Sequence, residues 1–427
     1  MGRIIGLVWL SAALLSTSAW AAPVDLVTLY KDLHAHPELA FHEVRSAGIL
    51  AAEARAAGFE VTEKVARTGV VAVLKNGDGP TVLIRADMDG LPVKEATGLP
   101  YASTAMGQYD VGPMTPVMHA CGHDIHMAVW VGTARWLAEN RKSWRGTVVM
   151  VGQPAEEAGG GAEAMLADGF LARFPKPDFA LALHDNSTLP AGQVSVPPYR
   201  ALSIISSLDI VVKGIGGHGA YPATTKDPVA LAARIVTALQ TIISRENDPF
   251  KPAVITVGSI HGGTKHNIIP DEVALQLTIR SYEAAQQQRL IDSIKRVVNG
   301  EAMAAGIPDR LMPTFRGGEF GPPTLNDTAL ATRLKAQFEA KLGKARVVDL
   351  DPSMASEDFQ YFGLKAKIPS VIYWLGGVGQ AQWDAAQKGG PAIPSLHNSG
   401  WAPDPAPTIA TGVESMTAAA VMLMPAK

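Results

Sequence analysis

Cysteine is almost absent from the sequence: Cys121 is the only one in 427 residues. One thiol cannot form an intrachain disulfide, so we expect the fold to be held by a hydrophobic core, which a chain of this length can supply. A basic excess is also lacking, since 37 Lys and Arg residues face 40 Asp and Glu residues. With a net charge of −3 and no basic cluster interleaved with aromatics, nucleic acid is not an expected partner.

The apolar run at the N-terminus, Ile4 to Leu15, falls short of the roughly twenty residues that a membrane-spanning helix needs. Arg3 precedes this run and Ala19-Trp20-Ala21 follows it as a small-x-small cleavage site. Residues 1–21 are therefore predicted to be a signal peptide, and an uncleaved membrane anchor is the alternative. We expect a mature chain that begins at Ala22, is periplasmic or secreted, and has no contact with the membrane.

The single cysteine lies in a dense polar segment, His119-Ala-Cys-Gly-His-Asp-Ile-His126, with three histidines and one carboxylate. Thiolate, imidazole and carboxylate are the groups that bind a borderline-soft divalent ion such as zinc. Cys121 and His123 are two residues apart and would point to the same side of an extended chain. This segment predicts a metal site.

The order of apolar runs predicts an α/β fold with a largely parallel sheet. The N-terminal part, residues 24–56, has a helical pattern, and another helix is predicted over 128–139. Short apolar runs typical of buried strands lie at 70–74, 81–84, 148–151 and 179–183. Three of them end in polar clusters that begin at Arg85, Gln153 and His184. Functional groups gather beyond the carboxyl ends of such strands, so these clusters are expected to converge on Cys121 and His123.

A second domain is predicted because the order of the predicted strands and helices changes after Pro197 and Pro198. Strand, helix, strand, strand and helix follow over 203–213, 227–244, 253–260, 273–280 and 284–305. We assign 22–197 and 315–427 to a first domain and 198–314 to an inserted α+β domain of ferredoxin-like type. A run at 370–375 and a closing helix at 408–424 complete the first domain.

The segment Gly214-Ile-Gly-Gly-His-Gly219 fits the G-x-G-x-x-G dinucleotide fingerprint and follows a predicted strand. The fingerprint requires a helix to open at once, whereas Ala220-Tyr-Pro-Ala223 intervenes. A nucleotide-binding role is therefore rejected. His218, at the tip of this Gly-rich turn, is either an ordinary exposed histidine or a group delivered into a site.

Five side chains could form one metal centre: Cys121, His123, Glu157, His184 and His397. Glu156 and Glu157 are neighbours that would point in opposite directions on extended chain, so one could bind metal while the other faces a water as general base. Alone, His184 or His397 could equally be a hydrogen-bonded core histidine. Five donors together suit a two-ion centre better than one tetrahedral ion. Zinc and manganese are the expected metals, with cobalt and nickel as alternatives.

Three further histidines, His34, His36 and His42, lie close together near the N-terminus and resemble a second metal cluster. On a helix running into Pro37 their spacing does not stack them on one face. Helix-capping or surface roles are predicted for them instead.

Ordered motifs along the chain resemble one enzyme family. They are Pro37-Glu-Leu-Ala-Phe41, Arg85-Ala-Asp-Met-Asp-Gly-Leu-Pro92, Met118-His-Ala-Cys-Gly-His-Asp124, Gln153-Pro-Ala-Glu-Glu157, Gly216-Gly-His-Gly-Ala220, Asn267-Ile-Ile-Pro270, Met354-Ala-Ser-Glu-Asp-Phe359 and Leu396-His-Asn398. The chain resembles the amidohydrolase branch of the aminoacylase and carboxypeptidase metallopeptidases, over nearly the whole mature length. That branch includes hippurate hydrolases, N-acetyl-diaminopimelate deacetylases and auxin-conjugate hydrolases.

The resemblance implies a role for each matching residue. The five donors named above would bind two divalent ions, and Glu156 would be the general base. The inserted domain would be a lid that pairs two subunits into a homodimer, with His218 reaching the neighbour's active site to steady the oxyanion. Asn267 and Arg280 match lid positions that can hold a substrate carboxylate. Asp87 and Asp89 would orient the metal ligands.

The expected reaction is hydrolysis of the amide bond of a small N-acyl amino acid, with a carboxylic acid and an amino acid as products. An exported dipeptidase or carboxypeptidase shares the same metal chemistry and is the first alternative. A binding protein without turnover is the second, although it would need no free carboxylate such as Glu156. The chain departs from the family at Ser399-Gly-Trp-Ala-Pro403 and at Met354-Ala355, which we expect to touch the rim of the pocket.

Overall fold

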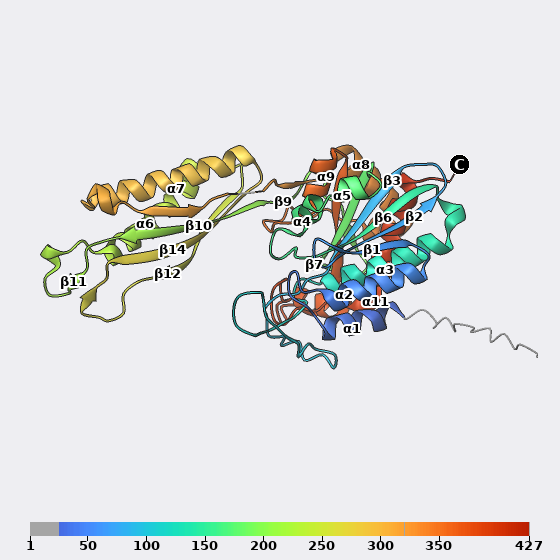
Figure 1. Ribbon diagram of the computed structural model, residues 1–427, viewed down its shortest axis with the longest axis horizontal. Coiled ribbons are helices and arrows are strands. Elements are labelled where there is room, and N and C mark those ends of the chain that lie inside the picture. The colour runs from blue at the N-terminus through green and yellow to red at the C-terminus, as the bar shows by residue number, and fades with distance from the viewer. Residues whose placement is uncertain (1–24, 320, 427) are drawn as a thin grey trace, which may run out of the picture.

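The computed structural model describes residues 25–319 and 321–426, so the predicted signal peptide lies outside the described residues. Figure 1 shows a larger body built on one sheet and a smaller body, built on a second sheet, that stands out to one side. Within the described ranges, no helix is both long and apolar enough to cross a membrane.

The larger body contains a seven-stranded sheet whose four central strands, in the order β6-β3-β7-β17, run parallel. Antiparallel strands extend it on both sides, β2 and then β1 next to β6, and β8 next to β17. The bounds are β1 (Glu60–Val65), β2 (Gly69–Asn76), β3 (Thr81–Asp87), β6 (Gly146–Gln153), β7 (Phe179–Pro190), β8 (Val194–Ser195) and β17 (Ser370–Val378). The central strands are nearly continuous buried apolar runs, as expected for a parallel sheet covered on both faces. The predicted α/β fold with a largely parallel sheet is confirmed.

Helices cover both faces of this sheet and form two cores (Figure 1). One core joins the sheet to α1 (Leu26–Ala35), α2 (Val44–Ala56), α3 (His123–Glu139), α8 (Thr328–Leu342) and α11 (Pro405–Leu423). The other joins it to α4 (Gly161–Ala167), α5 (Phe170–Arg173) and α9 (Gln360–Ala366). Shorter elements lie outside these layers: β4 (Met106–Gly107), β5 (Thr115–Pro116), β9 (Arg200–Leu202), β16 (Thr324–Leu325) and α10 (Gln380–Gln387).

The smaller body is a βαββαβ unit with an antiparallel sheet in the order β12-β14-β10-β15. Its elements are β10 (Ile204–Lys213), α6 (Pro228–Thr241, continued by a π-helical turn over Ile242–Glu246), β12 (Ala253–His261), β14 (Glu272–Ser281), α7 (Ala284–Ala304) and β15 (Thr314–Gly317). With the strands numbered along the chain, this order is 4-1-3-2, which is the ferredoxin-like arrangement. Burial alternates along β10 and β14 because α6 and α7 cover only one face of the sheet.

The predicted end of the insert at residue 314 falls within a strand. Phe315 lies in β15, which pairs with β10 as the fourth strand of the small sheet. Its sequence, Thr314-Phe-Arg-Gly317, has one large apolar residue, so the sequence of this segment gives little indication of a strand. The chain therefore stays in the small sheet through Gly317, and the boundary lies after that residue.

Candidate metal centre

The site lies where β3, β6 and β7 meet the start of α3. In the parallel pairing of β3 with β7, Arg85 lies opposite Ala182, which brings Asp87 level with His184. Gln153 ends β6 beside Asp87. The polar clusters after the three apolar runs therefore converge next to Cys121 and His123, as the sequence predicted.

The segment from Cys121 to His123 is a turn, and the prediction of extended chain there is wrong. Gly122 has a φ of 77°, a left-handed conformation that favours glycine, and His123 is the first residue of α3. A Cβ atom on Gly122 would lie 2.4 Å from the carboxylate of Asp185. The glycine thus lets the turn lie against Asp185 while Cys121 and His123 face the same cluster.

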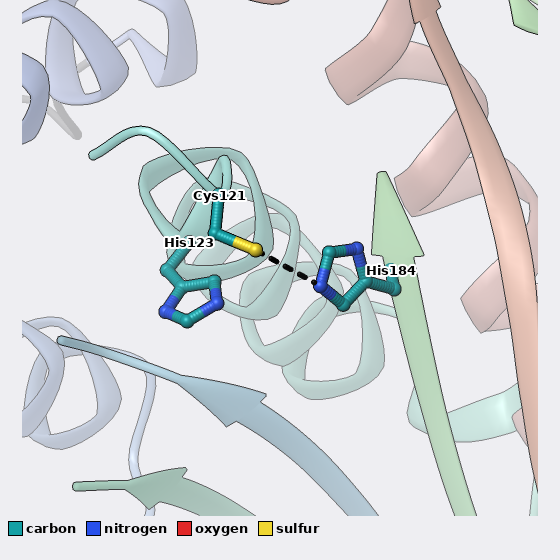
Figure 2. Close-up of side chains that lie close together, drawn as sticks. All are labelled: Cys121, His123 and His184. Carbon is teal, nitrogen blue, oxygen red and sulfur yellow. Dashed lines mark hydrogen bonds between the residues drawn. The ribbon is translucent and has the colours of Figure 1, made fainter. Parts of the chain in front are cut away.

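Short distances join the predicted ligands around Cys121. Its sulfur lies 3.5 Å from His184 Nε2 and 3.2 Å from His397 Nε2. Glu157 Oε1 lies 3.3 Å from His397 Nε2 and 4.0 Å from His123 Nε2. Figure 2 shows Cys121 and His123 at the start of α3, with the His184 ring directed at the sulfur from the neighbouring strand. The structure brings all five predicted ligands together.

Two of the histidines are oriented by backbone carbonyls. His123 Nδ1 donates to the carbonyl of Asp89 at 2.8 Å, and His184 Nδ1 donates to the carbonyl of Asp185 at 2.7 Å. These bonds place a lone pair on each Nε2, the nitrogen that faces the cluster, as a metal ligand requires.

The donor set passes a direct test for metal binding. His123 Nε2 is buried and has no hydrogen-bond partner in the described structure. Glu157 Oε1 is also buried without a well-directed hydrogen bond, although it lies 3.3 Å from His397 Nε2. Buried polar atoms are normally satisfied, so this arrangement indicates a missing bonding partner in the cluster. A thiol, three imidazoles and a carboxylate are suitable ligands for a divalent ion of the zinc type.

Glu156 and Glu157 also lie in a turn rather than on extended chain. Ala155 before them has a φ of 52°, and the two backbone N–H groups donate to the two oxygens of Asp89 at 3.1 and 3.0 Å. Asp89 therefore holds the turn from which the two side chains diverge. Of the pair, Glu157 faces Cys121 and His397, and Glu156 lines the adjoining cavity.

The surroundings push the pKa values of the two glutamates apart. Burial raises the pKa of Glu156 well above its ordinary value, and the nearby carboxylates of Glu357 and Glu157 add to this effect. Burial acts in the same sense on Glu157, but His397 and His123 outweigh it and lower its pKa. When the environment shifts the pKa values of two neighbouring carboxyl groups in opposite directions, the two groups commonly have different roles in the chemistry of the site.

A buried arginine network lies beside Glu156, and of its members only Asp87 was predicted from the sequence to have a role at the site. Arg85 donates to Asp87 at 2.7 Å, to Glu357 at 2.6 Å and to Gln153 at 2.8 Å. Gln153 in turn donates to Asp358 at 2.6 Å. The signal was present, because all of these residues belong to motifs already noted, but only the fold shows that they touch.

A cavity of about 1020 Å³ adjoins the cluster and lies between the two bodies. Its lining includes Glu156, Glu157 and His397 from the larger body and Ile205 and Arg280 from the smaller one. The half-buried Arg280 donates through Nη1 to the carbonyl of Met354 at 2.7 Å. The guanidinium of Arg280 is thus the cationic group that the insert brings to this cavity.

His218 and Asn267 lie elsewhere, at the far end of the insert. His218 is in β11 (Gly217–His218), which pairs with β13 (Ile268–Ile269) directly after Asn267. Both residues are exposed, neither lines the cavity, and Figure 1 shows β11 at the tip farthest from the large sheet. Within one chain the structure does not bring these two residues to the metal centre. The Gly-rich turn leads into β11 and a single 3-10 turn at Pro222–Thr224, and α6 begins only at Pro228.

The role predicted for His34 is wrong, since this residue neither caps a helix nor lies on the surface. Its ring is fully buried and bonds to Asp124 at 2.6 Å and to Glu95 at 3.0 Å. Burial lowers the pKa of His34, but these two carboxylates outweigh it and raise the pKa to about 10. His36 and His42 are exposed to a greater degree, as predicted.

Comparison with known proteins now decides the family. The model of Peptidase family M20/M25/M40 matches residues 83–388, a range that includes four of the five candidate ligands and ends before His397. The chain belongs to this family. The predicted resemblance is confirmed.

Relatives in the M20 family cover most of the chain. N-acetyl-L-cysteine deacetylase of Bacillus subtilis (strain 168) is 34% identical over 370 residues, which is 84% of this chain and 84% of that protein. IAA-amino acid hydrolase ILR1-like 2 of Arabidopsis thaliana is 34% identical over 351 residues, 82% of this chain and 76% of that protein. Like these M20 relatives, the chain is a hydrolase that acts on amide bonds.

The solved structure of the Bacillus subtilis YXEP protein, described as a dinuclear metal binding peptidase from the M20 family, has a similar fold. Its TM-score is 0.74 at 29% sequence identity, with 93% of this chain and 97% of that chain covered. The M20 fold thus extends over both bodies of the present chain.

Proposed function

We propose that this protein is a metal-dependent amidohydrolase that cleaves N-acyl amino acids into a carboxylic acid and a free amino acid. One observation carries the proposal. His123 Nε2, which is buried without a hydrogen-bond partner in the described structure, and Glu157 Oε1 face a cluster beside Glu156, at the edge of a cavity that Arg280 also lines. The names of the M20 relatives, an N-acetyl-L-cysteine deacetylase and an IAA-amino acid hydrolase, support this substrate class.

The metal centre would consist of two divalent ions held by Cys121, His123, Glu157, His184 and His397. The dinuclear site named for the Bacillus subtilis structure supports this number of ions. When bound, such ions lower the pKa of water from about 15.7 towards 7 and polarise a carbonyl oxygen. Zinc or manganese is the proposed metal, and cobalt or nickel would suit the same ligands.

Glu156 would be the general base. Its carboxylate lines the cavity beside Glu157 and is available to take a proton from the attacking water and pass it to the leaving nitrogen. Burial and the neighbouring carboxylates of Glu357 and Glu157 raise its pKa, which makes the Glu156 carboxylate a stronger base for taking the proton from water. Arg280 would pair with the free carboxylate of the substrate.

The insert would act as a lid that pairs two subunits, and the tip that carries His218 and Asn267 would reach the neighbour's cavity. The exposure of both residues, away from their own cavity, supports this arrangement. There His218 would donate to the oxyanion and Asn267 would bind the substrate carboxylate. Mixing inactive His218→Ala and Glu156→Gln proteins should restore activity in hybrid dimers. No recovery despite proven subunit exchange would refute the role in trans.

Export is the remaining part of the proposal, and the N-terminal signal pattern supports it. Fractionation of the producing cells, with N-terminal sequencing of the mature protein, should locate it outside the cytoplasm with Ala22 as its first residue. A cytoplasmic protein that still carries residues 1–21 would contradict this assignment.

The substrate class is tested by an assay of the metal-loaded protein on N-acetyl, N-benzoyl, N-indoleacetyl and long-chain acyl amino acids, with dipeptides in parallel. We expect amino acid release from one or more acyl amino acids. Activity on dipeptides alone would replace the proposal by the dipeptidase alternative. Stoichiometric binding without turnover of any compound would replace it by the binding-protein alternative.

A further inference from the structure

Trp401 lies in the part of the sequence where the chain departs from the family, and the structure contradicts its predicted place at the pocket rim. Its side chain is buried, with 1% of its surface exposed, and it does not line the cavity. The indole occupies a slot against β17. A Cβ atom on Gly377 would lie 3.0 Å from the ring, so the absence of a side chain there makes room for it.

The indole N–H is directed at the back of the metal centre. Trp401 Nε1 donates to Asp185 Oδ2 at 3.2 Å, and Asp185 is completely buried. The other carboxylate oxygen, Oδ1, lies 3.2 Å from His126 Nε2 and 3.3 Å from His184 Nδ1. In the described part of the chain, the hydrogen bond on Oδ2 comes from Trp401 alone.

Asp185 is in turn attached to His184 through the backbone. His184 Nδ1 donates to the Asp185 carbonyl at 2.7 Å and lies 3.3 Å from Asp185 Oδ1, so the carboxylate of Asp185 lies against the ring that faces Cys121. The side chain of Asp185 also lies against the Gly122 turn that carries Cys121 and His123. Asp185 therefore contacts the supports of three candidate ligands.

Trp401 also belongs to the loop that carries His397. His397 has a left-handed φ of 66°, and its N–H donates to the carbonyl of Ala120, next to Cys121, at 2.8 Å. Trp401 N donates to the carbonyl of Asn398 at 3.0 Å, which closes this loop. One residue thus connects the loop of His397 with the aspartate behind His184.

We propose that Trp401 is a positioning residue of the metal centre, whose indole N–H fixes Asp185 and thereby the spacing of His184 and His397 around Cys121. This inference rests on the proposed metal-dependent function and adds a residue to it. A phenylalanine would fill most of the same slot but would leave a buried carboxylate oxygen without its donor. Hydrogen-bonding partners behind metal ligands typically contribute about 10- to 100-fold to metal affinity.

The test compares Trp401→Phe with Trp144→Phe as a matched control. Trp144 is also fully buried and also donates through Nε1, in its case to the carbonyl of Leu137 at 2.9 Å. Leu137 lies fourteen residues along α3 from His123, which is about 21 Å of helix. Both variants lose one indole hydrogen bond, so similar changes are expected in the melting temperatures of the metal-free proteins.

The readout is the dissociation constant for Zn²⁺, measured by competition with a chromophoric chelator. Trp401→Phe should bind Zn²⁺ about 10- to 100-fold more weakly than wild type, and Trp144→Phe should be unchanged. In an Asp185→Asn background, Trp401→Phe should have little further effect, because it acts through that carboxylate. Equal affinities for the two phenylalanine variants, or full additivity with Asp185→Asn, would overturn the proposal. Wild-type protein that binds no Zn²⁺ or other divalent ion would instead contradict the proposed function itself.

Discussion

At the residue scale, the thiol of Cys121 has the most distinctive environment. Burial raises its pKa well above the ordinary value, and the carboxylates of Glu157 and Glu156 act in the same direction. In the metal-free protein at neutral pH the thiol therefore keeps its proton. A metal ion binds the thiolate, so binding must release that proton.

This gives a measurable pH dependence. Metal affinity of the wild-type protein should rise with pH, by about tenfold per unit for each proton released. Calorimetric titration in buffers of different ionisation enthalpy counts these protons. Cys121→Ser should bind the metal more weakly and release fewer protons than wild type, and an equal count in both proteins would exclude the thiol as a ligand.

His34 leads to a second prediction, on stability rather than metal binding. Asp124 and Glu95 raise the pKa of His34 to about 10 against the opposing effect of burial, and the rings of Tyr30 and Tyr101 pack beside it. Because its folded pKa exceeds the unfolded value of about 6.5, the stabilisation is fully present below pH 6.5 and is lost as the pH rises towards 10.

Urea unfolding at several pH values checks this sign. The free energy of unfolding of wild type should fall between about pH 7 and pH 10. His34→Gln should have a lower free energy of unfolding than wild type at pH 6, and its free energy of unfolding should fall less between pH 7 and pH 10. His36→Gln is the matched control, because His36 is exposed at the end of the same helix. A His34→Gln variant as stable as wild type at pH 6 would contradict the buried ion pair.

At the element scale, the turn that begins α3 combines two constraints on Gly122. Its φ of 77° is costly for any other residue, and the Asp185 carboxylate occupies the space of a Cβ atom. Gly98 has a similar φ of 73° but open space around it. Alanine at Gly98 should therefore cost about 1–2 kcal/mol through the backbone alone, and alanine at Gly122 should cost clearly more and weaken metal binding. Equal losses of stability by the two variants would show that the close approach to Asp185 contributes nothing.

The sequence predicted elements well where burial is strong on both faces. The strands β2, β3, β6, β7 and β17 are apolar runs, and each was placed within a few residues, apart from the long continuation of β7. The edge strand β1 was missed because Glu60-Val-Thr-Glu-Lys-Val65 is largely polar and exposed. Strand β15 was missed because its pairing with β10, and not its own pattern, makes it a strand.

The same contrast applies to the site. The ligand types and their grouping could be predicted because thiol, imidazole and carboxylate groups are rare enough to stand out. The turns at Gly122 and Ala155 could not, since they depend on contacts with Asp185 and Asp89. The hydrogen bond of Trp401 joins residues 216 positions apart, which no local pattern can reveal.

At the scale of the whole molecule, the insert has a role at the site because it forms one wall of the cavity between the two bodies. The larger body supplies the proposed metal ligands and Glu156, and the insert supplies Arg280 to the same space. The exposed tip with His218 and Asn267 lies far from this cavity, so the cavity of a single chain lacks two of the residues proposed for catalysis and substrate binding. A second subunit would complete it.

The proposed mechanism requires Glu156 to be the base of a metal-dependent hydrolase and not a metal ligand. The most direct test is to measure bound metal per chain and amino acid release for wild type, Glu156→Gln and the control Glu163→Gln, whose exposed carboxylate lines the same cavity. We expect equal metal content in all three proteins, wild-type turnover in Glu163→Gln, and a loss of turnover of about a hundredfold or more in Glu156→Gln. Near-wild-type turnover by Glu156→Gln, or loss of its metal, would show that Glu156 does not have this role.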